Sequence, residues 1–277
     1  MSILAGEKFE LRLIKSDEVL LHEECEDNRY KRLIERFNEE KVLYNPLIVG
    51  RYKNKFILID GANRFEALRQ MGCKAILAQL VNYKSSKVSL KSWYHFVNEM
   101  TMDDLKDYLD KTGLSYRKWS ASGRIKKGIR KVNQVGVVSK NGEAICIKFS
   151  KDLNEMLKSL CALNKFYETR FSYLRIDSDT DISNIDELSP DDGLLFVYPL
   201  FKKEHIVKIT KLKQKLPAGI TRHLIPNRVL HIKLLIDTLI TDQNLEHRNN
   251  ELEKFIQYKI DTKKVRLYKE PILVFDE

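Results

Sequence analysis

The sequence predicts an α/β fold of the α+β kind, divided near residue 85 into two domains, 1–85 and 86–277. Three observations lead to this prediction. A chain of 277 residues is long enough for two domains. Short apolar runs typical of buried strands alternate with segments whose apolar residues recur every three or four positions, as in amphipathic helices. The hydrophobic share of 43% and the scarcity of glycine (11) and proline (6) exclude a low-complexity chain.

In the first domain we expect the order strand, helix, hairpin, helix, strand. The first helix is indicated by apolar residues at positions 30, 33, 34 and 37, which fall on one helical face. Pro46 prevents this helix from continuing, and Gly72 stands where a left-handed residue ends the second helix. The expected elements lie at residues 9–14, 28–40, 47–49 with 56–59, 62–71 and 75–81.

We expect the second domain to continue as mixed helices and strands. Thr101 and Asp104 have the spacing of a capping box, which predicts a helix that ends before Gly113. Asn141-Gly142 is the strongest hairpin signal in the chain. Further helices are expected at 88–100, 152–167, 202–215 and 245–260, and strands at 135–139, 144–149 and 194–198, with 265–267 pairing with 272–275.

Cysteine spacing and hydropathy exclude several classes of protein. The four cysteines form no Cys-x-x-Cys pair and have no histidine at metal-ligand spacing, so we expect buried thiols rather than a zinc site or a disulfide scaffold. No apolar run approaches the roughly 18 residues of a membrane span, and the first residues show no export signal. We therefore expect a soluble cytoplasmic protein that has no membrane partner.

The net charge of +10, from 49 basic and 39 acidic residues, suits an anionic partner. A nucleic acid and a phosphorylated small molecule both meet this description. Basic and acidic residues are interspersed along the chain, except for a concentration of basic residues over positions 117–131. This stretch is either a solvated basic loop or a DNA contact, and the charge alone does not decide between them.

The sharpest local feature is the turn that follows the apolar run 56–59. A buried strand leads into Asp60-Gly61, and a helix begins at once with Ala62-Asn63-Arg64. The first amide groups of a helix lack partners and its dipole favours an anion, so a phosphate could bind there. Gly61 permits close approach, Arg64 can add a charge-assisted hydrogen bond, and Asp60 could hold a cation or act on a hydroxyl. The alternative is an ordinary aspartate cap, and the residues alone leave both interpretations open.

This turn resembles the signature of the ParB/sulfiredoxin superfamily. The resemblance includes the preceding strand, the Leu-x-x-x-Gly helix end and the upstream run Asn45-Pro46-Leu-Ile-Val. It implies a ParB/sulfiredoxin-like nucleotide-binding domain over 1–85 and a C-terminal mixed α+β domain over 86–277 that completes the site. The sulfinic-acid reductases of the superfamily carry a catalytic cysteine directly after the glycine, where this chain has Ala62. The Gly-Glu-Arg-Arg box and helix-turn-helix domain of the partition proteins are not evident in the sequence.

Three further motifs resemble those of the free-serine kinases in the superfamily. They are His22-Glu23, Ser92-Trp93-Tyr-His95 and Pro217-Ala-Gly-Ile-Thr221-Arg222. The resemblance implies that Glu23 is the catalytic base and that Trp93 and His95 line the serine pocket. The remaining roles that we predict are catalysis for Asp60, nucleotide binding for Gly61, Ala62, Asn63 and Arg64, and binding of the serine carboxylate for Thr221, Arg222 and His223. Asn63 stands where these kinases usually have histidine.

The implied function is a free L-serine kinase that uses ATP or ADP with Mg²⁺ and yields O-phospho-L-serine. Such a product would feed siderophore or 2,3-diaminopropionate biosynthesis, and a homodimer is one expected assembly. Without the resemblance, Glu23 is equally a solvated residue before a helix, Trp93 a core residue and Thr221-Arg222 a structural turn. The alternative function is that of a ParB-like DNA-binding transcriptional regulator, with or without kinase activity.

Overall fold

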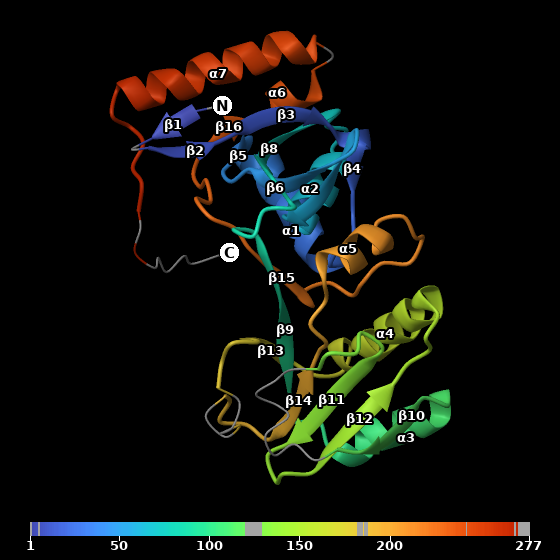
Figure 1. Cartoon of the computed structure of the whole chain (residues 1–277). Helices are drawn as coiled ribbons and strands as arrows, with labels where there is room; N and C mark the ends of the chain where they lie inside the picture. Colours follow the sequence, from blue (N-terminus) through green and yellow to red (C-terminus); the bar gives the residue numbers. More distant parts are fainter. Residues whose placement is uncertain are drawn as a thin grey trace. The chain divides into compact units, whose positions relative to one another are not determined.

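The computed structural model describes residues 2–4, 6–119, 129–181, 185, 188–241, 243–268 and 270. It has the expected mixed α/β architecture, in which helices and strands are interspersed along the chain (Figure 1). The chain forms two compact units, which we describe separately. The first unit comprises Met1–Leu20, Cys25–Val88 and Ile225–Glu277, and the second comprises Leu21–Glu24 and Ser89–Leu224.

A five-stranded mixed sheet forms the core of the first unit. The pairs β6–β8 and β4–β7 are parallel, whereas β3–β8 and β6–β7 are antiparallel. The strand β8, which lies between β3 and β6, is buried over its first six residues, as expected for a strand covered on both faces. The order across the sheet is β3 (Leu11–Lys15), β8 (Ala75–Val81), β6 (Leu47–Tyr52), β7 (Lys55–Asp60) and β4 (Val19–Leu20).

Two helices and two short ladders complete the N-terminal part of this unit. Helices α1 (Asp27–Glu40) and α2 (Ala62–Gln70) pack against each other, which confirms the helices predicted at 28–40 and 62–71. Gly72 has the positive φ of 78° expected at the second helix end. The ladders join β1 (Ser2–Leu4) to β2 (Glu7–Phe9) and β5 (Val42–Leu43) to β16 (Leu234–Leu235).

The C-terminal segment belongs to the first unit. Helix α6 (Asp237–Ile240) contacts β8, and α7 (Leu245–Asp261) lies beside β3 (Figure 1). The Asn249 side chain fixes α7 because its Oδ1 accepts from the Leu13 amide at 2.8 Å and its Nδ2 donates to the Leu13 carbonyl at 3.0 Å. The sequence analysis places residues 225–277 in the second domain. The roles assigned to domains 1–85 and 86–277 stay a prediction.

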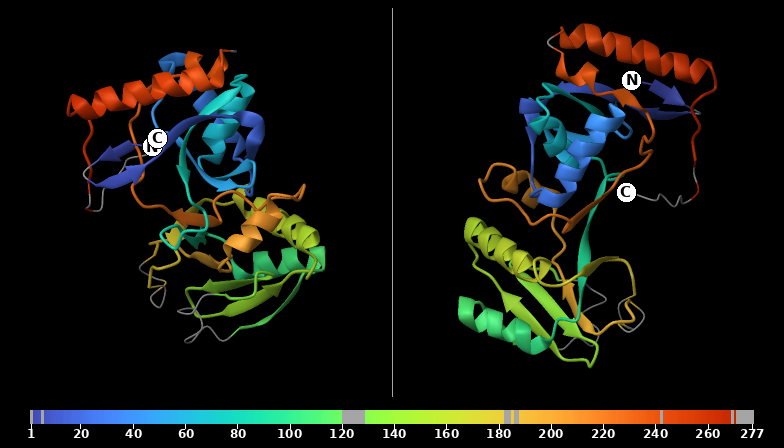
Figure 2. Two further views of the ribbon diagram at one scale, coloured as in Figure 1. Left: turned by 45° about the horizontal axis from the view of Figure 1, so that its top comes forward. Right: turned by 180° about the vertical axis from the view of Figure 1, so that it is seen from behind.

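A seven-stranded antiparallel sheet forms the second unit, and helices α3 and α4 lie on one of its faces (Figures 1 and 2). The strand β15 (Thr221–Leu224) pairs with β9 outside the main order. The main order is β10 (Ser115–Lys118), β12 (Ala144–Lys148), β11 (Gln134–Ser139), β14 (Gly193–Val197), β9 (Ser89–Asn98) and β13 (Tyr173–Asp177). The helices are α3 (Met102–Thr112), α4 (Leu153–Glu168) and α5 (Lys203–Ile209).

The helix predicted at 88–100 is wrong, because these residues form the strand β9. This strand pairs with β13, β14 and β15 and is covered on both faces, so Tyr94 and Phe96 on one face are as buried as His95 and Val97 on the other. A strand covered on both sides loses the alternation of polar and apolar residues that would distinguish it from a helix.

The basic helix predicted at 202–215 is also too long, because α5 ends at Ile209. The Lys215 ammonium donates to the carbonyls of Ile209 (3.3 Å) and Thr210 (3.2 Å), so the chain turns back over the helix end. Carbonyl groups at a helix C-terminus lack helical partners, and a lysine can satisfy them. Composition alone does not reveal this reversal.

Other local predictions are confirmed. Thr101 and Asp104 form the capping box of α3, and β11 and β12 pair across the Asn141-Gly142 turn, where Gly142 has φ 84°. Residues 265–267 form no strand among the described residues, and 272–275 lie outside the described part. In the part of the chain that the structure describes, no helix is long and apolar enough to cross a membrane.

We predict that Asn249→Ala lowers the free energy of unfolding by about 1–3 kcal/mol, because the Leu13 amide and carbonyl lose their hydrogen-bond partner. The matched control is Asn250→Ala, which removes the same side chain at an exposed position of α7 and should change stability by less than about 0.5 kcal/mol. Urea unfolding of both variants measures the difference. Equal losses would show that the Leu13 bonds do not anchor α7.

Candidate functional site

The predicted site residues fall into two groups, one in each unit. Asp60, Gly61, Ala62, Asn63 and Arg64 belong to the first unit. Glu23 and the residues of the Trp-x-His and Pro-x-Gly motifs belong to the second. Each group is described within its own unit.

In the first unit, the chain turns sharply between β7 and α2. Gly61 adopts φ 99° at the N-cap of α2, a conformation that favours glycine. The Arg64 guanidinium folds back over this turn and donates to Asp60 Oδ2 at 2.9 Å. A Cβ atom at Gly61 would lie 2.9 Å from Arg64 Nη2, so glycine is needed both for the turn and for the approach of Arg64.

A second arginine, Arg228, reaches the same aspartate. Its Nη2 lies 3.3 Å from Asp60 Oδ1. The buried Gln79 side chain places it, because Nε2 donates to the Asn227 carbonyl at 2.8 Å and Oε1 accepts from the Val229 amide at 2.9 Å. The sequence analysis missed Arg228, since nothing local distinguishes it from other surface arginines. The residue that explains its position is Gln79, on the buried strand β8, which is far from Arg228 in sequence.

Asn63 connects α2 to the start of α1. Its Oδ1 accepts from the Glu26 amide at 2.8 Å, and Cys25 Sγ donates to the Ala62 carbonyl at 3.4 Å. Glu26 is the N-cap of α1, so Asn63 satisfies an amide at the entry to that helix. The nucleotide-binding roles predicted for Ala62 and Asn63 stay predictions.

In the second unit, Glu23 and Thr221 are in direct contact. Glu23 Oε1 accepts from the Thr221 amide at 2.7 Å and from its hydroxyl at 2.5 Å, while Oε2 accepts a longer bond of 3.4 Å from the Gly219 amide. The single hydroxyl proton of Thr221 goes to the carboxylate, so His22 Nε2, 2.9 Å from Thr221 Oγ1, is the donor to that oxygen. Two motifs far apart in sequence therefore meet at one carboxylate.

The backbone around Glu23 is fixed as well. The Leu216 amide donates to the His22 carbonyl at 2.9 Å, and the Glu24 amide donates to the Leu216 carbonyl at 2.8 Å. His223, on β15, packs edge-on against the His22 ring with centroids 5.4 Å apart. Both rings are buried, and the His22 ring contacts the Thr221 hydroxyl.

Trp93 and Arg222 lie side by side on the paired strands β9 and β15. The Arg222 guanidinium stands 4.6 Å from the Trp93 ring centroid, a cation–π contact, and it forms an ion pair with Asp177 on β13. All three side chains thus belong to one half-buried polar surface. The sequence analysis did not identify Asp177.

His95 is completely buried behind the Pro217–Arg222 loop. Its Nε2 lies 3.0 Å from the Gly219 carbonyl, which can only accept, so Nε2 carries the proton and Nδ1 accepts from the Tyr167 hydroxyl at 2.6 Å. The Tyr167 oxygen accepts in turn from Asn164 Nδ2 (2.7 Å), and the Tyr198 hydroxyl lies 2.6 Å away. Burial raises the pKa of Tyr167 well above its ordinary value. His95 therefore supports the loop from behind.

Arg175, which the sequence analysis missed, lies on β13 opposite His95. Its guanidinium packs against Gly219, whose φ is 71°, and a Cβ atom there would lie 2.3 Å from Arg175 Cζ. Glycine at this position thus allows a cation to reach the loop that holds Glu23 and Thr221. No spacing rule in the sequence connects residues 175 and 219.

Metal and cysteine chemistry find little support among the described residues. These residues contain no group of three or more His, Cys, Asp or Glu that could hold a metal ion. The four cysteines are thiols, two buried and two half-buried, and burial raises the pKa of Cys73 to about 11. The expectation of buried thiols thus holds for Cys73 and Cys146, whereas Cys25 and Cys161 are half-buried.

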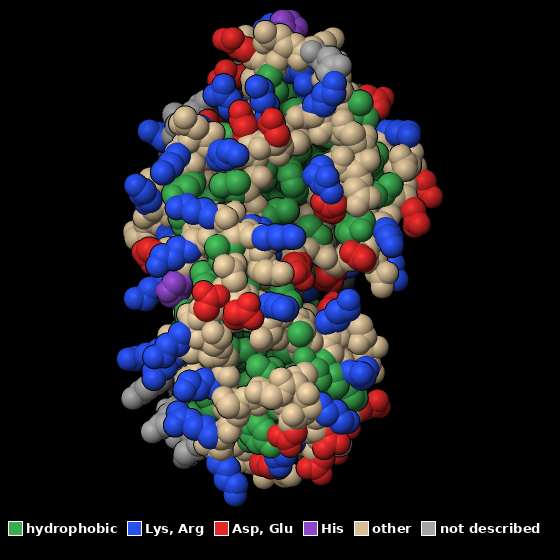
Figure 3. Space-filling model, turned by 90° about the vertical axis from the view of Figure 1, so that its right-hand side faces the viewer, with side chains coloured by type: hydrophobic (Ala, Val, Ile, Leu, Met, Phe, Trp, Pro, Cys, Tyr) green, Lys and Arg blue, Asp and Glu red, His purple; other side chains and the backbone are tan. Residues whose placement is uncertain are grey.

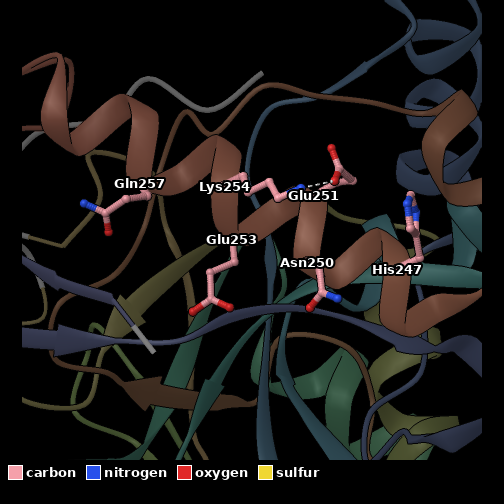
Figure 4. Close-up of a pocket in the computed structure, with 6 residues that line it drawn as sticks. All are labelled: His247, Asn250, Glu251, Glu253, Lys254 and Gln257. Atoms are coloured by element: carbon pink, nitrogen blue, oxygen red, sulfur yellow. Dashed lines mark hydrogen bonds and ion pairs between the residues drawn. The ribbon is translucent and has the colours of Figure 1, made fainter.

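Outside these two groups of site residues, the described surface carries a hollow on α7 and charges of both signs. A hollow on α7 is lined by His247, Asn250, Glu251, Glu253, Lys254 and Gln257, and Glu251 forms an ion pair with Lys254 there (Figure 4). Lys and Arg side chains are interspersed with Asp and Glu over the face in Figure 3. In the basic stretch 117–131, residues 120–128 lie outside the described part.

The chain is similar to proteins named as serine kinases. It is 28% identical over 224 residues to an ATP-dependent L-serine kinase of Staphylothermus marinus, covering 77% of this chain and 85% of that protein. It is 24% identical over 264 residues to the ATP-dependent L-serine kinase SbnI of Staphylococcus aureus, covering 93% and 96%. No family model matches the chain.

Solved structures share the fold. A C-terminally truncated SbnI superposes with a TM-score of 0.71 at 21% identity, covering 90% of this chain and 97% of that one. A free serine kinase in complex with AMP superposes with a TM-score of 0.68 at 16% identity, covering 84% and 95%. The mixed α/β fold expected from the sequence is confirmed.

We predict that Gly219→Ala is more destabilising than Gly142→Ala. Both glycines have positive φ in the second unit, but a Cβ atom meets nothing within 4 Å at Gly142 and meets Arg175 at Gly219. Both variants should lose about 1 kcal/mol from backbone strain, and Gly219→Ala about 1–3 kcal/mol more from the displaced side chain. Urea unfolding measures both, and equal losses would contradict the tight packing of Arg175.

Proposed function

We propose that this protein is a kinase of free L-serine that transfers the terminal phosphoryl group of ATP or ADP to the serine hydroxyl. The observation that carries the proposal is the contact between Glu23 and Thr221, at which the His-Glu and Pro-x-Gly-x-Thr-Arg motifs meet. The similarity to two proteins named as ATP-dependent L-serine kinases supports it, with coverage extending over most of each chain.

Glu23 Oε2 is the atom that we assign as the base. Oε1 accepts the two Thr221 bonds, whereas Oε2 accepts one long bond of 3.4 Å from Gly219 among the residues that the structure describes, and it retains lone pairs for a further donor. In the proposed step the serine hydroxyl gives its proton to Oε2 while its oxygen forms a bond to the terminal phosphorus. The bond from that phosphorus to the bridging oxygen breaks, and the nucleotide leaves with one phosphate fewer.

We assign serine recognition to cationic and aromatic side chains of the second unit. Arg222, held against Trp93 and Asp177, and Arg175, held against Gly219, offer guanidinium groups to the serine carboxylate. Trp93 covers the polar surface and limits access of water. Of the residues predicted for this role, His95 is buried with both ring nitrogens engaged, so we assign it to positioning the Gly219 carbonyl.

The first unit supplies positive charge for the nucleotide phosphates through Arg64 and the N-terminus of α2. Asp60 already holds two arginines, which leaves it poorly suited to bind a metal as well. We therefore propose that Mg²⁺ enters as the metal complex of the nucleotide, a common mode for this ion. When bound, it would neutralise charge on the phosphates.

We predict that Glu23→Gln lowers the rate of O-phospho-L-serine formation by about 10²–10⁴-fold, because glutamine cannot accept the hydroxyl proton. The matched control is Glu24→Gln, at the adjacent exposed carboxylate, which should retain turnover. Mass spectrometry after incubation with L-serine, Mg²⁺ and either ATP or ADP detects the product.

The same assay distinguishes a wrong base from a wrong function. Product formation by Glu23→Gln at the wild-type rate would contradict the role of Glu23 while leaving the kinase in place. If the wild-type protein phosphorylates no free amino acid with either nucleotide, the kinase proposal fails and the DNA-binding regulator becomes the better interpretation.

A further inference from the structure

We propose that Arg228 and Arg64 form a two-arginine fork that binds the phosphates of the nucleotide, with Asp60 as the residue that positions both. This inference rests on the proposed function, since it requires a nucleotide to be the ligand of the first unit. It adds a residue from the C-terminal segment to the turn after β7, and it gives Asp60 a positioning role in place of a catalytic one.

The geometry of Asp60 supports the fork. Its two carboxylate oxygens engage different arginines, with Arg64 Nη2 2.9 Å from Oδ2 and Arg228 Nη2 3.3 Å from Oδ1. Both guanidinium groups are therefore neighbours of one carboxylate, and each approaches a different oxygen. Neighbouring guanidinium groups match the spacing of phosphate oxygens, which accept paired hydrogen bonds from arginine.

The charge of the cluster also favours a phosphate. Two guanidinium groups and one carboxylate leave a net charge of +1, and each guanidinium has five N–H donors, of which Asp60 uses only part. The Arg64 and Arg228 side chains are 26% and 42% exposed, so a ligand can reach them. Asp60 balances the charge of only one of the two arginines, and a phosphate ligand would balance the other.

Hydrogen bonds fix the backbone on both sides of Arg228. Gln79 is 2% exposed and uses both ends of its amide to hold the backbone on either side of Arg228. Asn227, with φ 53°, makes the turn and donates to Glu7 Oε2 at 2.8 Å. A buried glutamine and a left-handed asparagine thus fix the backbone on either side of Arg228, whose side chain pairs with Asp60.

The test is the affinity for ATP and for adenosine, measured by calorimetry with the full chain. We expect Arg228→Gln to weaken ATP binding about 10- to 100-fold, as for loss of a charge-assisted hydrogen bond, and to change adenosine binding less than twofold. Arg228→Lys, which keeps the charge but loses the fork, should fall between wild type and Arg228→Gln. The control is Arg51→Gln, which removes an arginine that is 51% exposed and paired with Glu10 in the same unit.

The outcomes separate this inference from the proposed function. Unchanged ATP affinity in Arg228→Gln would overturn the fork, as would equal losses for ATP and adenosine, which would indicate a structural role. Both leave the kinase proposal intact, because turnover is tested at Glu23. A wild-type protein that binds neither ATP nor ADP would overturn the fork and the kinase together.

Discussion

The arrangement of the second unit's site depends on the carboxylate of Glu23. It accepts both the amide and the hydroxyl of Thr221, while the Leu216 backbone pairs with residues 22 and 24 and sets the register. Residues 21–24 belong to this unit through these bonds, although the residues before and after them belong to the first. Losing one partner would leave polar groups unsatisfied at a cost of about 1–3 kcal/mol each, so the segment and the loop are ordered together.

A buried hydrogen-bonded chain holds this loop from the other side. The Gly219 carbonyl determines which groups donate along this chain. Because that carbonyl can only accept, His95 Nε2 carries the proton, and the Tyr167 hydroxyl donates to His95 Nδ1. The side chains of His95, Tyr167 and Tyr198 are fully buried, so the bonds among them are electrostatically stronger than in water and the loss of a partner would be costly. These bonds hold the Pro217–Arg222 loop in a single conformation. A catalytic base requires such a fixed loop if Glu23 Oε2 is to face the substrate.

Local signals in the sequence predicted most elements but few of their long-range contacts. The helix at 28–40, the capping box at Thr101 and the Asn141-Gly142 hairpin depend on neighbours within a few residues, and all three are confirmed. The strand β9 was mistaken for a helix because tertiary burial removed its polar face. Arg175 and Arg228 could not be found, since Gly219 and Gln79, which explain their positions, are remote in sequence and unremarkable in type.

The charges of the two groups of residues match two different ligands. In the second unit, Arg222 is paired with Asp177, and Arg175 approaches the loop bonded to Glu23, so two acids balance two arginines. A balanced set suits a free amino acid, which carries one charge of each sign. In the first unit, two arginines share one aspartate and leave an excess positive charge, which suits a polyphosphate. Because folding already fixes these arginines, less of the binding free energy is lost in ordering flexible side chains.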